Sequence, residues 1–265
     1  MQPPFACPTA TWHKDTYDSI SPSRPELSVA GKTVVVVGAG SGIGRETALA
    51  FAAAGATHVA LLGRTDATLK ETAAREELGD AAAAIGKWHI LVLSSGYCPD
   101  PAPVALSTPG EWWKGFEINA MGTLLAVKAF LPTADTHATI LGLTSDTSLV
   151  PTSYLPGLSA YVSSKLAQAK VYEFLAAENP DFFVATVNPG MVETDNFNRS
   201  GGKADQLPMD TVQLPAHFLV WMASPEAAFL RGRTTWANWD VDELKAQKEK
   251  IGDGLFMTAG FKGLP

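Results

Sequence analysis

The sequence predicts an α/β fold in which helices cover both faces of a doubly wound parallel sheet. Short runs rich in valine, isoleucine and leucine alternate with longer segments of helical periodicity, as strands and crossover helices do in such folds. In residues 32–54, four consecutive valines precede a glycine-rich turn and a strong helix former. The 265 residues, 46% of them hydrophobic, suffice for one such domain with a sizeable core.

Composition argues against several classes of function. The net charge of −7 argues against a nucleic-acid surface. Neither the two cysteines, Cys7 and Cys98, nor the five scattered histidines have the spacing of metal ligands, so no metal site is expected. There is no apolar run of about 18 residues and no signal-peptide pattern at the N-terminus, so we expect a cytoplasmic protein that does not bind membranes.

Residues 1–28 contain prolines and polar residues without any period. We expect them to form an extended arm in front of a single domain of residues 29–265. Trp12, Tyr17 and Ile20 carry side chains that could dock the arm on that domain. A loose arm is the alternative, and the sequence does not choose between the two.

A glycine-rich turn connects the first predicted strand, 34–37, to a helix over 45–54. Its glycines occupy alternate positions: Gly38, Gly40, Gly42 and Gly44. Strand, glycine turn and helix together place backbone N–H groups and a helix N-terminus against a phosphate, and side chains in the turn would keep a pyrophosphate away. The segment therefore predicts a Rossmann-type dinucleotide site. Its G-x-x-x-G-x-G spacing differs from the general fingerprint, and a tight turn in another α/β protein is the alternative.

The second predicted strand, 57–62, ends in Gly63-Arg64. Dinucleotide folds place the residue that reads the ribose about 20 positions beyond the glycine turn, where this chain has Arg64. An acid there would hold the ribose 2′-hydroxyl of NAD, whereas an arginine suits the 2′-phosphate of NADP. Arg64 therefore favours NADP(H), with a solvated arginine as the alternative.

The interval after this strand is short. Only 23 positions separate Arg64 from Lys87, and the next apolar strand begins at Trp88. A helix, a strand and a second helix of average length need roughly 28 residues before any loops. We therefore expect about six parallel strands, without an ordinary third strand and its following helix.

Two polar residues stand out in the middle of the chain. Asn119 lies among apolar neighbours within a predicted helix over 110–131, where a buried amide needs hydrogen-bond partners. An exposed or self-satisfied asparagine is the alternative. Ser145 follows the predicted strand 139–143, at the edge of a parallel sheet where ligands bind.

The predicted helix over 159–178 places Tyr161 and Lys165 four residues apart on one face. A lysine beside a phenol lowers the phenol pKa, which makes tyrosine a usable general acid or base. Surface decoration is the alternative for so short a motif.

The remaining predicted elements are a strand over 182–187, a sharp turn at Pro189-Gly190, a polar lid over 196–214, an apolar helix over 215–224, a strand over 234–237 and a solvated helix over 242–251.

These pieces agree in order and spacing, and over about residues 30–240 the chain resembles the classical short-chain dehydrogenase/reductase family. The arm and the NWDVDEL tail are similar to those of fungal members. The resemblance rests on GAGSGIG, the Gly63-Arg64 strand end, Asn119, Ser145, YVSSK with Tyr161 and Lys165, and NPGMVET.

The resemblance implies an NADP(H)-dependent oxidoreductase that interconverts a ketone and a secondary alcohol. Tyr161 would exchange a proton with the substrate oxygen, and Ser145 would polarise that oxygen, with Ser148 an alternative by its distance from Tyr161. Lys165 would bind the nicotinamide ribose and lower the Tyr161 pKa, and Asn119 would hold a water in a proton relay. The implied cofactor-binding residues are Gly38, Ser41, Gly42, Ile43, Gly44, Arg64, Tyr161, Lys165, Pro189, Gly190, Val192 and Thr194.

The resemblance also implies a small carbonyl or alcohol substrate and a homodimer or homotetramer. Apolar residues on more than one face of the helices 110–131 and 159–178 agree with a partner subunit.

The chain departs from the family pattern in three places. Val37 replaces the usual threonine before the first glycine, and Leu93-Ser94-Ser95-Gly96 replaces Asn-Asn-Ala-Gly, which removes an amide that steadies the central strand. The missing third strand takes with it an aspartate that contacts adenine. A non-redox protein of the same fold, such as an isomerase, a cyclase or an idle binding subunit, is therefore the alternative function.

Overall fold

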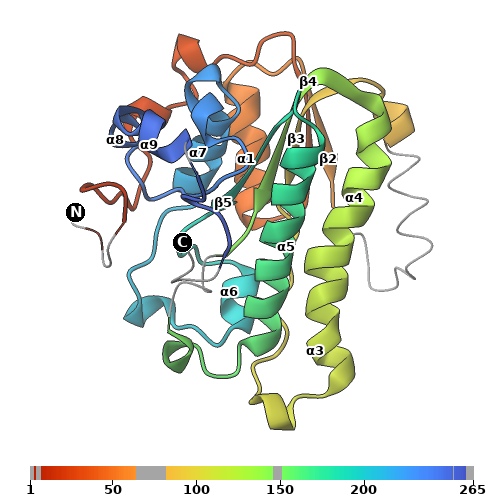
Figure 1. Ribbon diagram of the computed structural model, residues 1–265, viewed down its shortest axis with the longest axis vertical. Helices are drawn as coiled ribbons and strands as arrows, with labels where there is room; N and C mark the ends of the chain where they lie inside the picture. The colour runs from red at the N-terminus through yellow and green to blue at the C-terminus, as the bar shows by residue number, and fades with distance from the viewer. Residues whose placement is uncertain (1–2, 4–6, 64–81, 146–150, 253, 261–265) are drawn as a thin grey trace.

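The structure, a computed structural model, describes residue 3 and residues 7–63, 82–145, 151–252 and 254–260. Six parallel strands form one sheet in the order β2-β1-β3-β4-β5-β6 (Figure 1). The strands are β1 (Thr33–Val37), β2 (His58–Leu62), β3 (Trp88–Leu93), β4 (Ala134–Leu143), β5 (Phe183–Asn188) and β6 (Thr234–Trp236).

The predicted Rossmann-type parallel sheet is confirmed, with the expected six strands among the described residues. Strand β2 lies at one edge and pairs with β1, which pairs with β3 on its other side. The segment expected to form the short crossover between β2 and β3 falls largely on residues 64–81, which lie outside the described part of the chain.

Helices cover both faces of the sheet (Figure 1). Within the first strand, Val34 and Val36 pack with α1 and α7, whereas Val35 packs with α4 and α5. The run of valines is therefore buried on both sides because successive side chains of a strand point to opposite faces. The helices are α1 (Gly42–Ala53), α3 (Pro109–Phe116), α4 (Gly122–Phe130), α5 (Ser159–Glu178), α6 (Asp195–Arg199), α7 (Gln213–Met222), α8 (Val241–Ala246) and α9 (Lys248–Gly252).

The helix expected over 110–131 contains one π-helical turn. Residues Glu117–Met121 form this turn between α3 and α4, and the backbone stays helical across both junctions. Asn119 lies inside the turn and is completely buried. Such single π turns are frequent at functional sites, but the apolar spacing of the sequence does not reveal one.

The N-terminal arm is docked on the domain, so the loose alternative is wrong for its described residues. Ile20 and Leu27 are buried in the core that contains α1 and α7. Trp12 forms an isolated antiparallel bridge with Trp239, and the Tyr17 hydroxyl donates to the Trp239 carbonyl at 3.1 Å. The arm therefore packs on the C-terminal part of the chain.

The segment expected to be one solvated helix over 242–251 forms two short helices, α8 and α9, and it is partly buried. Leu244 and Ile251 are fully buried because the segment packs against the core beneath it. No helix in the described part of the chain is long and apolar enough to cross a membrane.

Candidate active site

A cavity of about 1190 Å³ opens at the carboxyl edge of the sheet. The glycine turn, the segments after β3, β4 and β5, the start of α5 and the α6 region line it. Twelve of the residues expected in the site line this cavity. Asn119 does not line it, and Arg64 and Ser148 lie outside the described residues. The twelve are Gly38, Ser41, Gly42, Ile43, Gly44, Ser145, Tyr161, Lys165, Pro189, Gly190, Val192 and Thr194.

Close packing explains two of the glycines. Gly38 has a φ of +90°, and a Cβ there would lie 2.8 Å from the backbone nitrogen of Ser95. A Cβ on Gly44 would overlap the Gly38 carbonyl oxygen. The turn can therefore fold against the end of β3 only with glycine at both positions.

Ser94 restores a contact that the Leu93-Ser94-Ser95-Gly96 replacement was expected to remove. Its hydroxyl and its backbone N–H both donate to the Val37 carbonyl, at 2.8 and 2.9 Å. A serine hydroxyl thereby ties the end of β3 to the end of β1, where a side-chain amide was expected.

Lys165 is buried at the floor of the cavity. Its Nζ donates to the Leu143 carbonyl at 3.0 Å and to Gln168 Oε1 at 2.9 Å. Burial without an acidic partner lowers the pKa of the amine to about 8. The Gln168 amide in turn donates to Thr123 Oγ1 at 2.9 Å, so α4 fixes the partner of the lysine.

Both the oxygen and the nitrogen of the Asn119 side-chain amide have hydrogen-bond partners. Its Oδ1 accepts from the Tyr97 backbone N–H at 2.8 Å, and its Nδ2 donates to the Tyr97 carbonyl and to Ser164 Oγ, both at 2.9 Å. The buried amide is therefore satisfied by the loop after β3 and by α5. This pairing fixes the Tyr97 backbone, and the water relay expected of Asn119 stays a prediction.

Tyr161 and Ser145 both line the cavity and lie close together. Burial raises the pKa of Tyr161 to about 12, the nearby Cys98 also raises it, and the Ser145 hydroxyl opposes the rise. The direction is opposite to the expected one, because Lys165 directs its amine to Leu143 and Gln168. Cys98 is itself buried, which raises its thiol pKa to about 11.

The helix α6 is joined to the loop after β3 by a group of contacts that we call the Arg199 latch. Arg199 Nε donates to the Cys98 carbonyl at 2.9 Å, and its Nη2 donates to the Tyr97 hydroxyl at 2.8 Å and to Asp100 at 2.7 Å. The guanidinium also lies 4.6 Å from the centre of the Tyr97 ring. The Tyr97 hydroxyl donates to Glu111 at 2.5 Å, which holds the pKa of that carboxyl below its usual value.

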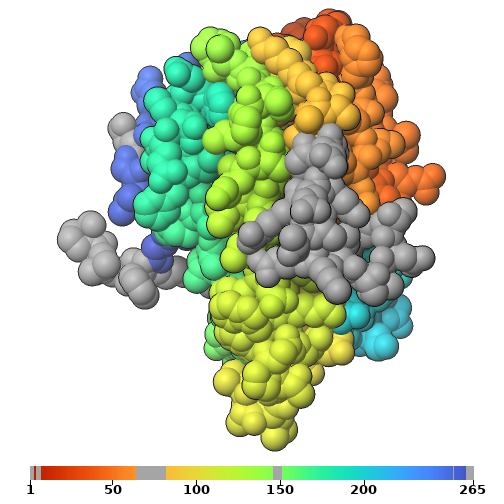
Figure 2. Space-filling model, turned by 90° about the vertical axis from the view of Figure 1, so that its right-hand side faces the viewer, coloured from red at the N-terminus to blue at the C-terminus, as the bar shows by residue number. Residues whose placement is uncertain are grey.

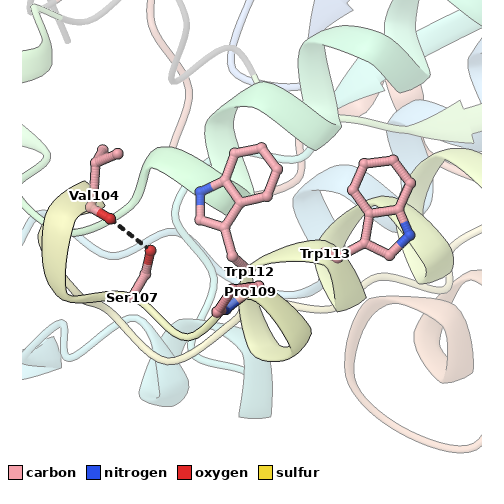
Figure 3. Close-up of a pocket in the computed structure, with 5 residues that line it drawn as sticks. All are labelled: Val104, Ser107, Pro109, Trp112 and Trp113. Atoms are coloured by element: carbon pink, nitrogen blue, oxygen red, sulfur yellow. Dashed lines mark hydrogen bonds between the residues drawn. The ribbon is translucent and has the colours of Figure 1, made fainter.

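A second, shallower hollow of about 450 Å³ lies at the start of α3 (Figure 3). Trp112 and Trp113 project from the helix beside Val104 and Pro109, and the Ser107 hydroxyl donates to the Val104 carbonyl at 2.9 Å. None of these five side chains is an acid or a base, so the hollow lacks the groups for proton transfer that the large cavity holds.

Comparison with known proteins shows the family. A family model described as short chain dehydrogenase matches residues 32–86, and one described as enoyl-(acyl carrier protein) reductase matches residues 64–238. A short chain dehydrogenase/reductase of Claviceps purpurea is 33% identical over 280 residues, covering 96% of this chain and 94% of its own. Short chain dehydrogenase citE of Monascus ruber is 32% identical, covering 92% and 94%. The chain therefore belongs to the short-chain dehydrogenase/reductase family.

Solved structures share the fold. A short chain dehydrogenase from Shigella flexneri, complexed with NADP, superposes with a TM-score of 0.70 at 21% identity over 81% of this chain and 99% of its own. A 7α-hydroxysteroid dehydrogenase, complexed with NADH and a 7-oxo bile acid, gives 0.69 at 21% identity, covering 84% and 97%.

Sequence reasoning missed several residues that line the cavity. Tyr97, Cys98 and Arg199 lie in segments without periodicity, and their association depends on contacts about 100 positions apart. Trp12 and Lys14 of the arm also line the cavity. The apolar side chain of Trp12 was the only signal, and it could not indicate which surface the arm covers.

Proposed function

We propose that this protein is an NADP(H)-dependent oxidoreductase that interconverts a ketone and a secondary alcohol. The observation that carries the proposal is that Ser145 and Tyr161 lie close together in the same cavity as the glycine turn, with Lys165 buried at its floor. Membership of the family supports an oxidoreductase, and the named relatives are short-chain dehydrogenases.

The cavity suits a dinucleotide together with a substrate. Single-ligand pockets commonly measure about 300–1,000 Å³, and this one is larger, at about 1190 Å³. A Cβ on Gly42 would lie 3.2 Å from Thr194 Cγ2, so the start of α1 and the segment after β5 face each other closely enough to hold a ligand from two sides. Gly42 and Gly44 would bind the phosphates, while Val192 and Thr194 would contact the nicotinamide.

The preference for NADP(H) rests on Arg64 and its neighbours. The backbone N–H groups of Gly38 and Ala39 donate to the Leu62 carbonyl at 2.7 and 3.0 Å, so β2 ends beside the glycine turn. A Cβ on Gly63 would lie 3.6 Å from the Gly40 nitrogen. Gly63 therefore lies beside the glycine turn, and Arg64 is the next residue in the sequence. Among the solved structures that share the fold, the Shigella flexneri protein is complexed with NADP and the 7α-hydroxysteroid dehydrogenase with NADH, so the preference depends on Arg64.

Each catalytic group has a distinct role in the proposed reaction. The bound cofactor supplies or accepts the hydride. Tyr161 donates its proton to the ketone oxygen in reduction and accepts it back in oxidation, and Ser145 donates a hydrogen bond to the same oxygen. With a pKa near 12, Tyr161 is protonated at neutral pH, which is the form needed for ketone reduction. Lys165 would hold the ribose, and its positive charge would stabilise the phenolate that forms.

The Tyr161→Phe variant tests the proposal. It should lose at least about 100-fold in kcat for NADPH-dependent ketone reduction, the usual contribution of a positioned general acid. The dissociation constant for NADPH should change by less than about two-fold, because the ring and the shape of the pocket stay. Steady-state NADPH oxidation and titration calorimetry measure the two quantities. Undiminished turnover would assign the proton transfer to another group, and failure of the wild-type protein to bind either nicotinamide cofactor would favour a non-redox role.

A further inference from the structure

The N-terminal arm forms part of the wall of the large cavity. Trp12 and Lys14 line it beside Trp236 and Asn238, which lie in and after β6. The two family models match residues 32–86 and 64–238, so the arm is outside both matches. Neither family model therefore covers the arm's contribution to the cavity.

Hydrogen bonds hold the arm in one position. His13 Nε2 lies 2.9 Å from Asp240 Oδ2, and the His13 backbone exchanges bonds with Asn238: its N–H donates to the Asn238 carbonyl, and its carbonyl accepts from Asn238 Nδ2, both at 2.8 Å. The carbonyl of Lys14 accepts from the Thr211 N–H at 2.8 Å. The arm is therefore fixed between the segment after β6 and the segment that leads into α7.

Trp12 and Trp236 form a rigid aromatic surface at the end of the cavity. Their ring centres are 5.5 Å apart at an angle of 55°, and Trp236 stacks on Trp239 at 6.4 Å. Trp12 is only 7% exposed and Trp236 only 8%. Two adjoining indoles tilted in this way form an apolar corner in the cavity wall, which an aromatic ring of a ligand can contact by offset stacking or edge to face.

The sheet gives the backbone separation between Trp236 and the strand that Ser145 follows. Trp236 is in register with Asn188 on β5, and β5 is the neighbour of β4, which Ser145 follows. Two strand spacings amount to about 10 Å. A substrate whose oxygen lies at Ser145 can therefore reach the indoles only if its body extends well beyond the carbonyl group.

We propose that Trp12 is a specificity-determining residue, and that the substrate is a carbonyl compound with a planar aromatic ring system whose far end lies against Trp12 and Trp236. This inference rests on the proposed function, because it places the substrate oxygen at Ser145 and Tyr161. Small aliphatic ketones do not span the cavity and gain nothing from the indole surface.

The test compares two ketones, 2-acetonaphthone and 2-butanone, in NADPH-dependent reduction. In the Trp12→Ala variant the KM for 2-acetonaphthone should rise about ten-fold, which is the upper range for one aromatic pair, while the KM for 2-butanone should change by less than about two-fold. The Trp12→Phe variant should retain most of the preference because it keeps a flat ring. Trp113→Ala is the matched control, since Trp113 is 55% exposed on α3 and lines only the separate hollow.

Titration calorimetry with 2-acetonaphthone separates this inference from the proposed function. Binding that depends on Trp12 without any reduction would contradict the proposed function and support the aromatic site. Reduction of 2-acetonaphthone with an unchanged KM in Trp12→Ala, or equal KM changes for both ketones, would overturn the inference. If Trp12→Ala fails to fold by circular dichroism, Trp12→Leu makes the same comparison, because it keeps an apolar side chain and removes the flat ring.

Discussion

Lys165 combines deep burial with hydrogen bonds to uncharged acceptors. Among the described residues its amine has Leu143 and Gln168 as partners, neither of which is charged, so folding takes a charge out of water without an opposite charge there to offset it. Such a buried amine lowers the stability of the folded protein, and its charge responds to pH and to ligands. Two predictions at the scale of single residues follow, one for Lys165 and one for Arg64.

The first concerns the pH dependence of stability. The Lys165 amine has a pKa of about 8 in the folded protein and 10.5 as its ordinary value. Between these values the unfolded state binds one more proton, so this residue makes the free energy of unfolding rise with pH, by at most about 1.4 kcal/mol per pH unit. Below pH 8 both states are protonated and the slope disappears.

Urea unfolding of the wild type and Lys165→Met between pH 7 and 10 measures this effect. The difference in unfolding free energy between the two proteins should shift in favour of the wild type above pH 8. A difference that stays constant over this range would show that the Lys165 pKa is not lowered.

The second prediction concerns Arg64. A charge-assisted contact to the 2′-phosphate contributes on the order of 1.5–3 kcal/mol, so Arg64→Ala should weaken NADPH binding about 10- to 150-fold. NADH, which lacks this phosphate, should bind with little change. Titrations of both cofactors at low and moderate salt measure the effect, and discrimination should shrink as salt rises. Equal losses for the two cofactors would show that Arg64 does not recognise the phosphate.

At the scale of elements, the strands and the helix of Tyr161 could be predicted because their signals are local. The helix over 159–178 and the strand over 88–93 have the expected bounds. The π turn at Asn119 left no such signal, because one additional residue per turn is too small a change for the apolar spacing to show. The contacts of the Arg199 latch could not be predicted from the sequence either, because they join segments about 100 positions apart.

The latch gives a prediction for α6. Arg199→Met should loosen α6 from Tyr97 and Cys98, leaving in place the bond from the Cys98 N–H to Asn196 Oδ1. The KM for the carbonyl substrate should then rise by about 3- to 10-fold through loss of charge-assisted bonds. NADPH affinity and kcat should change by less than about two-fold. Arg233→Met is the control, because Arg233 donates to carbonyls of the C-terminal tail, away from the cavity. A loss confined to kcat would contradict a role of the latch in holding substrate.

At the scale of the whole molecule, large apolar side chains are exposed on α3, α4 and α5 and on the π turn before α4. The helices α4 and α5 lie beside each other on one face (Figure 2). The exposed apolar side chains of these elements include Trp113, Met121, Leu124, Leu166 and Phe174. Exposed apolar side chains that gather on one face are typical of an interaction surface.

The face predicts a homo-oligomer. Analytical ultracentrifugation at micromolar concentration should show a dimer or tetramer, and Phe174→Glu should shift it towards the monomer, because a charge would be buried at the contact. Phe174 is 61% exposed in the single chain. Leu49→Glu on α1, where Leu49 is 56% exposed, is the matched control. A wild-type monomer, or equal effects of the two variants, would contradict the assignment of this face.

The docking of the arm on the far end of the chain has a consequence for biosynthesis. His13 and Asp240 are 227 positions apart, so the nascent arm leaves the ribosome long before its partner exists. At roughly 5–20 residues per second, the interval is on the order of 10–50 s. During translation Trp12 is made before Trp236 and Trp239, and one end of the cavity can form only after these residues have been made. The arm, which is made before the sheet, is in this sense among the last segments to reach its native place.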